Sequence, residues 1–118
     1  MQYKLYNDDF DIIIDSKGCE IISVVRKQDS KQYIWNGNPD AWKRHTPVLF
    51  PLVGRYKNDT SVYKGKEYHM TQHGFARDSE FTLVHKEDNV IIMSLTSSEA
   101  TKQKYPFDFE LMITHRLS

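Results

Sequence analysis

The stretch Phe107-Asp108-Phe109-Glu110-Leu111-Met112-Ile113-Thr114-His115-Arg116-Leu117 decides the fold class of this chain. Apolar residues occupy the odd positions from 107 to 113 and position 117, whereas charged or polar residues occupy positions 108, 110, 114 and 116. A repeat of two residues is typical of a β-strand that buries one of its faces. We therefore expect a strand here, with His115 on its apolar face as a core or interface residue.

The same alternation of β-branched or aromatic residues with polar residues recurs along the chain, and no window shows a helical period. Turns that contain glycine, or polar loops, separate the candidate strands. These strands are residues 3–7, 10–15, 20–27, 32–35, 61–63, 67–70, 81–85 and 90–95. The fold class is therefore predicted to be all-β, with hairpin turns at 64–66 and 86–89.

The alternation still continues where the sequence ends, at Leu117 and Ser118. A strand that stops in mid-alternation leaves an apolar face and a pairing edge uncovered, and natural domains usually protect such edges. We therefore expect residues 1–118 to form one unit that is a truncated part of a larger domain.

Composition limits the classes of partner. The chain has 118 residues, and its 16 lysines and arginines balance 16 aspartates and glutamates. A neutral chain provides no net field that would attract nucleic acid or an anionic membrane surface. The longest apolar run, 48–53, is too short to cross a bilayer. A soluble cytoplasmic protein with a small-molecule partner is predicted, with no nucleic acid and no membrane.

The sequence offers no metal site. Cys19 is the only cysteine, so an intrachain disulfide and a thiolate cluster are both excluded, and a buried hydrophobic role is expected for it. His69 and His73 are four residues apart, but Gly74 and the strand pattern argue against the helix that would place both rings on one side.

Two irregular regions, 36–56 and 70–81, are expected to carry any site, because in an all-β frame the functional residues concentrate in such segments. Residues 46–51 contain two prolines, which excludes a central strand, yet they are too apolar to remain in water. We predict that they form a buried crossing segment outside the sheet ladders.

His73 stands out among the five histidines because it lies in Gln72-His73-Gly74-Phe75-Ala76-Arg77. This loop combines an imidazole, an aromatic face and a guanidinium, a set that suits a polyhydroxylated ligand. From composition alone, a chance grouping of loop residues is the alternative. His45, His69 and His85 are expected at the surface.

Arg55 emerges directly from the apolar run, after Gly54. An arginine in such a place either pairs with a carboxylate or points into a cleft, and its sequence context leaves both interpretations open.

Three segments in this order resemble the aldose 1-epimerase (galactose mutarotase-like) family, especially its LacX-type branch. They are PVLFPLVGR at 47–55, YKGKEY at 63–68 and QHGFAR at 72–77, and YPFDF at 105–109 adds to the resemblance. The resemblance implies that the chain is the N-terminal portion of a large antiparallel β-sandwich. It also implies an isomerase that binds a hexose and interconverts its α and β anomers by acid/base ring opening, without a cofactor.

Matching the family's motifs assigns roles to individual residues. His73 corresponds to the first of the histidines that serve the ring oxygen, and Arg55 to the arginine that contacts sugar hydroxyls, while Phe75 and Arg77 complete the expected substrate-binding set. The family's second histidine and its glutamate base have no counterpart in this chain, so the chain alone is expected to be inactive.

One departure from the family pattern bears on the substrate. Gly54 stands where galactose mutarotases have asparagine, so the resemblance does not imply a preference for galactose. The expected ligand is a hexose or a hexose phosphate, with Arg44 and Arg77 as candidate phosphate contacts. Two alternatives belong to other classes. One is a non-catalytic module that binds a carbohydrate or sugar phosphate, and the other is an interaction domain that pairs, even with a second copy of itself, through its exposed last strand.

Overall fold

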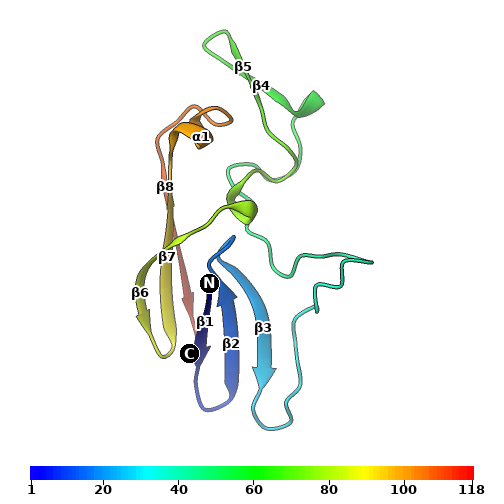
Figure 1. Ribbon diagram of the computed structural model, residues 1–118, viewed down its shortest axis with the longest axis vertical. Helices are drawn as coiled ribbons and strands as arrows, with labels where there is room; N and C mark the ends of the chain where they lie inside the picture. Colours follow the sequence, from blue (N-terminus) through cyan, green and yellow to red (C-terminus); the bar gives the residue numbers. More distant parts are fainter.

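A computed structural model describes residues 1–118, and its strands form three antiparallel sheets (Figure 1). The first contains β1 (Gln2–Tyr6), β2 (Phe10–Asp15) and β3 (Glu20–Arg26), the second β4 (Thr60–Tyr63) and β5 (Lys66–His69), and the third β6 (Thr82–Glu87), β7 (Val90–Thr96) and β8 (Glu110–Arg116). Every paired strand adjoins its neighbour in sequence. The all-β prediction is confirmed.

The two three-stranded sheets are joined by hydrogen bonds at the C-terminal end of β1. The Tyr6 N–H donates to the Asp88 carbonyl at 2.8 Å, and the Asn7 side-chain amide donates to the Ser118 carbonyl at 2.9 Å. Residues 1–7 therefore lie against the loop between β6 and β7 and against the end of the chain.

The core lies where these two sheets meet the crossing segment, which runs over residues 46–54 and is three residues longer than the predicted 46–51. Ten buried residues form one cluster, namely Leu5, Ile14, Cys19, Met70, Phe75, Ala76, Phe81, Ile91, Met93 and Leu95. Val48, Phe50 and Leu52 pack against this cluster from a segment that contains no strand. The prediction that this segment lies outside the sheet ladders is confirmed, but its residues are only partly buried, and Leu49 is exposed.

The alternation that decided the fold class is visible in β8. Leu111, Ile113 and His115 are partly buried, whereas the residues between them are exposed. β8 is an edge strand of its sheet, as expected, and it begins at Glu110, after the two phenylalanines of the quoted stretch.

The predicted strand at 32–35 is wrong. Only Gln32 forms an isolated bridge, with Val25, and its side-chain oxygen accepts the Val24 N–H at 2.7 Å. Because this side chain replaces the backbone as the partner of β3, the chain turns away after Tyr33, whose N–H still donates to the Val24 carbonyl.

A one-turn helix, α1 (Glu99–Lys102), was not predicted. The Ser98 hydroxyl accepts the Thr101 N–H at 3.2 Å, and the Thr101 hydroxyl accepts the Ser98 N–H at 2.8 Å. This reciprocal cap satisfies terminal donors that a single turn would otherwise leave free. The spacing Ser-x-x-Thr is the sequence signal that could have indicated it.

The molecule is elongated, with extents of 57 × 34 × 21 Å. Its radius of gyration is 16.5 Å, against roughly 13–14 Å for a compact domain of this length. Many large apolar side chains are consequently exposed, among them Trp35, Trp42, Val62 and Met112. The helices are single turns, and none has the length or the apolar character needed to cross a bilayer.

Candidate functional site

His73 and Gly54, nineteen residues apart, hold each other by two hydrogen bonds. The His73 N–H donates to the Gly54 carbonyl at 2.8 Å, and the Gly54 N–H donates to His73 Nδ1 at 2.9 Å. Both residues have left-handed backbone conformations, with φ of +67° at His73 and +92° at Gly54. The structure therefore joins the end of the crossing segment to the loop that the sequence singled out.

Gly74 allows this junction to form. A Cβ at this position would lie 2.3 Å from the Phe50 carbonyl oxygen, a distance that real Cβ atoms do not reach. The Phe75 and Ala76 N–H groups both donate to the same carbonyl, at 3.0 and 3.1 Å. Residues 73–76 are thus bound along residues 50–54 by main-chain contacts, and the His73 side chain projects from a backbone that is held at both ends.

Arg55 follows Gly54 and lies at the surface. Its side chain is 61% exposed, and its Nε is 3.0 Å from an Asp59 carboxylate oxygen. Of the two interpretations that the sequence left open, the carboxylate pair is present. The pair is exposed and four residues apart in sequence, so it contributes little stability and leaves the remaining guanidinium nitrogens accessible.

Phe75 is placed in the core. It is 8% exposed, and its ring packs against Phe50, with centroids 6.3 Å apart, and against Phe109, at 5.9 Å. Tyr105 also contacts Phe50, with 6.1 Å between the ring centroids. The ring packs beneath the loop that carries His73. That it also stacks against a sugar remains a prediction.

Arg77 turns back onto its own loop, where its guanidinium donates to the Gln72 carbonyl at 2.8 Å. It also lines a polar hollow of about 360 Å³ together with Arg44, the second candidate phosphate contact. Lys17 and Lys43 line the same hollow, as do His45 and the carboxylates Asp15, Glu20 and Asp78. The structure therefore brings Arg44 and Arg77 together, whereas neither His73 nor Arg55 borders this hollow.

The carboxylates around the hollow already have partners. Asp78 pairs with Arg44 at 3.0 Å, Asp15 lies 3.7 Å from the N-terminal ammonium, and Glu20 accepts the N–H groups of His45 and Thr46. In contrast, the side chains of Lys17, Lys43 and Arg77 form no ion pair in the structure. The hollow thus has three cationic groups without a carboxylate partner.

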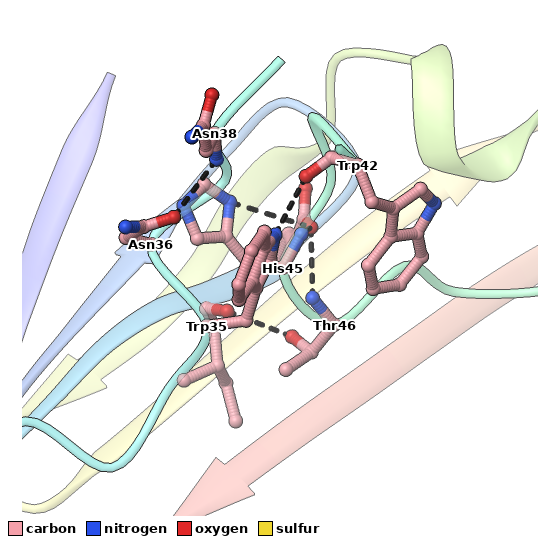
Figure 2. A network of polar contacts seen from close by, with 8 residues as sticks. Trp35, Asn36, Asn38, Trp42, His45 and Thr46 are labelled. Atoms are coloured by element: carbon pink, nitrogen blue, oxygen red, sulfur yellow. Dashed lines mark hydrogen bonds and ion pairs between the residues drawn. The ribbon is translucent and has the colours of Figure 1, made fainter. Parts of the chain in front are cut away.

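His45 is not the surface residue that was predicted, because Glu20 and Gly37 enclose it. Its Nδ1 lies 3.7 Å from a Glu20 oxygen, and a Cβ on Gly37 would approach the ring to 2.7 Å. Figure 2 shows this network, in which the Trp35 indole donates to the Trp42 carbonyl at 2.6 Å. Glu20 holds residues 45 and 46 through their N–H groups, and no pattern in the sequence indicated this contact.

The other histidines behave as expected. His69 and His85 are exposed on β5 and β6. A ring nitrogen of His115 lies 3.1 Å from the Cys19 carbonyl, which supplies the polar partner of this partly buried ring. Cys19 itself is fully buried, and this burial raises the pKa of its thiol to about 11.

Comparison with known sequences identifies the family of the chain. The sequence model of the family described as aldose 1-epimerase matches residues 1–118. The chain belongs to the aldose 1-epimerase family. It is 28% identical over 123 residues to the plasmid-encoded LacX protein of Lactococcus lactis subsp. lactis, covering all of this chain and 41% of that protein.

Solved structures of the family have the same fold over this region. A galactose mutarotase related enzyme from Lactobacillus acidophilus is 42% identical with a TM-score of 0.99, and a galactose mutarotase-like protein from Lactobacillus casei ATCC 334 is 35% identical with a TM-score of 0.96. All of this chain is covered, but only 39% and 40% of those chains. The chain thus spans about two fifths of the length of these relatives and shares the fold of galactose mutarotase-like proteins over that part.

Proposed function

We propose that this chain contributes one wall of the sugar site of an aldose 1-epimerase, with His73 and Arg55 as its hexose contacts. The observation that carries the proposal is the pair of hydrogen bonds between Gly54 and His73. These bonds hold the residue before Arg55 against the imidazole of the loop, which supports the assignment of both family motifs to one site. Arg55 keeps donors free for sugar oxygens, and His73 is only partly buried.

The chemistry of mutarotation requires two proton transfers. A base removes the proton of the C1 hydroxyl while the ring oxygen gains one, the ring opens to an aldehyde, and closure on either face of the carbonyl gives either anomer. Arg55 and His73 can hold the sugar by hydrogen bonds to its oxygens. Because the family's glutamate base has no counterpart in residues 1–118, we propose that the chain binds a hexose and does not by itself accelerate anomerisation.

Two measurements on the 118-residue chain test this proposal. Polarimetry of a freshly dissolved hexose should follow the uncatalysed rate, because the base is missing. Titration with the same hexose, followed by NMR, should shift the backbone amide signals of the Gly54–His73 region in a saturable way, a readout that the His73 and His85 variants retain. Saturable binding lost in His73→Ala and retained in His85→Ala, an exposed histidine on β6, would support the site. Rapid anomerisation by the chain would contradict the proposed inactivity, and the absence of any shift would contradict the site.

Binding of a hexose phosphate is a second candidate, favoured by the hollow next to η2 (Ala76–Asp78). Lys17, Lys43 and Arg77 border it without carboxylate partners, and phosphate oxygens are good acceptors for such donors. Arg77 belongs to the same loop as His73, so one ligand could engage that loop through both its sugar and its phosphate.

A comparison of three ligands tests this candidate. If the phosphate is bound in the hollow, a hexose 6-phosphate should bind at least about tenfold more tightly than the hexose, since one charge-assisted contact is worth roughly 1.5 kcal/mol or more. Arg77→Gln should abolish the difference, whereas Lys86→Gln on the exposed strand β6 should not. Equal affinities for the two sugars would exclude the candidate, and equal affinities of inorganic phosphate and hexose phosphate would show that the hollow recognises the anion alone.

The interaction-domain alternative also has support in the structure. β8 is an edge strand, and Met112 on its outer face is 50% exposed. Sedimentation over a range of concentrations would detect pairing through this edge, and Met112→Lys should reduce it. A monomer at all concentrations would count against this alternative.

A further inference from the structure

The hydrogen bond between the Gly54 N–H and His73 determines which ring nitrogen carries the proton. The donor is a peptide N–H, which cannot accept a hydrogen bond, so Nδ1 accepts the bond at 2.9 Å with its lone pair. A neutral imidazole has one protonated and one unprotonated nitrogen. The proton of neutral His73 therefore lies on Nε2, which has no hydrogen-bond partner within the chain.

The orientation of the His73 ring is fixed by the backbone of both residues and not only by the rotamer of the side chain. The His73 N–H returns to the Gly54 carbonyl at 2.8 Å, so the two residues are joined through both peptide groups of Gly54 and through the ring. The left-handed φ of Gly54, +92°, costs a glycine little but costs other residues roughly 1–2 kcal/mol. No atom lies within 4 Å of a Cβ added at Gly54, so only conformation restricts this position.

We infer that His73 acts in the proposed sugar site as a hydrogen-bond donor through Nε2, and that Gly54 is the positioning residue that imposes this role. The inference rests on the proposed function only for the identity of the acceptor, a sugar oxygen. An imidazolium would carry a proton on Nδ1 as well and could not accept the Gly54 N–H, so this hydrogen bond requires the neutral ring. Transfer of the Nε2 proton from the neutral ring would leave an imidazolate anion, which is strongly unfavourable. The proton that the ring oxygen gains must therefore come from another group, and His73 orients the sugar.

The tautomer can be read directly in the ligand-free chain. Long-range ¹H–¹⁵N correlation spectra of the uniformly ¹⁵N-labelled protein, at a pH where the rings are neutral, distinguish a protonated nitrogen from an unprotonated one. His73 should show a single form with the proton on Nε2, and exposed His85 should show averaged values. A His73 ring protonated on Nδ1, or averaged like His85, would overturn the inference even if the chain binds sugars.

Gly54→Ala and Gly65→Ala form a matched pair for the positioning role. Both glycines have a left-handed φ, +92° and +77°, and both have open space around a new Cβ. The two variants should lose similar stability, but only Gly54→Ala should move the His73 ring signals toward averaged tautomers. Identical His73 spectra in the two variants would show that Gly54 does not position the ring.

The donor role is tested by two substitutions of His73 itself. The amide of His73→Gln can place an N–H donor near the position of Nε2 but cannot exchange protons as an imidazole does. Hexose affinity should therefore fall by a few fold in His73→Gln and by more than about tenfold in His73→Ala. Equal losses in the two variants, with both folded by NMR, would contradict a donor role. Failure of the wild-type chain to bind any hexose would instead refute the proposed function and leave the tautomer result standing.

Discussion

The Gly54–His73 junction and the hairpin turn between β4 and β5 both depend on a glycine with a left-handed backbone conformation, but the two glycines have different structural roles. Gly54 and Gly65 are both left-handed, and at neither position would an added Cβ have a neighbour within 4 Å. In the hairpin, Lys64 and Gly65 only reverse the chain, since Tyr63 pairs with Lys66. At the junction, the Gly54 peptide groups bind a residue nineteen positions away and orient its ring. A glycine in the sequence thus indicates a turn. Whether that turn does more than reverse the chain depends on which distant residue its peptide groups contact.

Gly74→Ala should give the largest effect, because here the junction differs most from the hairpin. The new Cβ would meet the Phe50 carbonyl oxygen at 2.3 Å and its carbon at 2.6 Å, and both belong to the main chain. We expect a loss of at least about 4 kcal/mol of unfolding free energy, or no folding at all. Urea unfolding of Gly74→Ala and Gly65→Ala measures the two losses of unfolding free energy. Similar losses would contradict the difference expected between the junction and the hairpin.

Phe75→Ala should have the next largest effect, because it removes the ring beneath the junction. Phe75 is buried among Phe50, Phe109 and the rest of the core. Deletion of a buried phenylalanine costs about 3–5 kcal/mol. Val62→Ala on the hairpin, where Val62 is 66% exposed, should cost less than about 0.5 kcal/mol. Chemical denaturation of both variants compares them, and a loss below about 1 kcal/mol for Phe75→Ala would show that the cluster does not support the loop.

Alkaline pH should weaken the buried side of the molecule through Cys19, which belongs to the same core cluster as Phe75. Burial raises the thiol pKa from 9.0 to about 11, so the folded chain keeps a proton that the unfolded chain loses. The stabilisation is complete below pH 9 and is lost as the pH rises from 9 to about 11. The loss should reach about 3 kcal/mol at most. Unfolding free energies against pH for the wild type and Cys19→Ala measure it, and parallel curves would refute it.

Gly54→Ala and Gly65→Ala should show the smallest effect on stability. Each should cost about 1 kcal/mol, since a side chain in the left-handed region is strained even where it meets no atom. Thermal unfolding of the two variants should therefore agree within error. A much larger loss for Gly54→Ala would show that its hydrogen bonds to His73 contribute to global stability as well as to the position of the ring.

Patterns that extend over a few residues predicted the structure well. The alternation in β8 and the hairpin at Lys64 and Gly65 were recognised because strand faces and tight hairpins depend on local backbone geometry. Lys66, which was expected in the turn, is the first residue of β5. The strand expected at 32–35 failed because the Gln32 side chain competes with the backbone for the edge of β3. The exposed position of His45 failed because Glu20, twenty-five residues earlier, encloses it. Propensity contains no information about either contact.

The sequence by itself determined that the chain is all-β, and it singled out the loop from Gln72 to Arg77 as the candidate site, because repeats, turns and motifs are local properties of the chain. Tertiary structure alone decided that Gly54 holds His73, that Arg44 and Arg77 share a hollow, and that Phe75 belongs to the core. These are contacts between residues distant in sequence, and they exist only after the crossing segment has packed against the loop. The direction in which the His73 ring presents its proton depends on that packing.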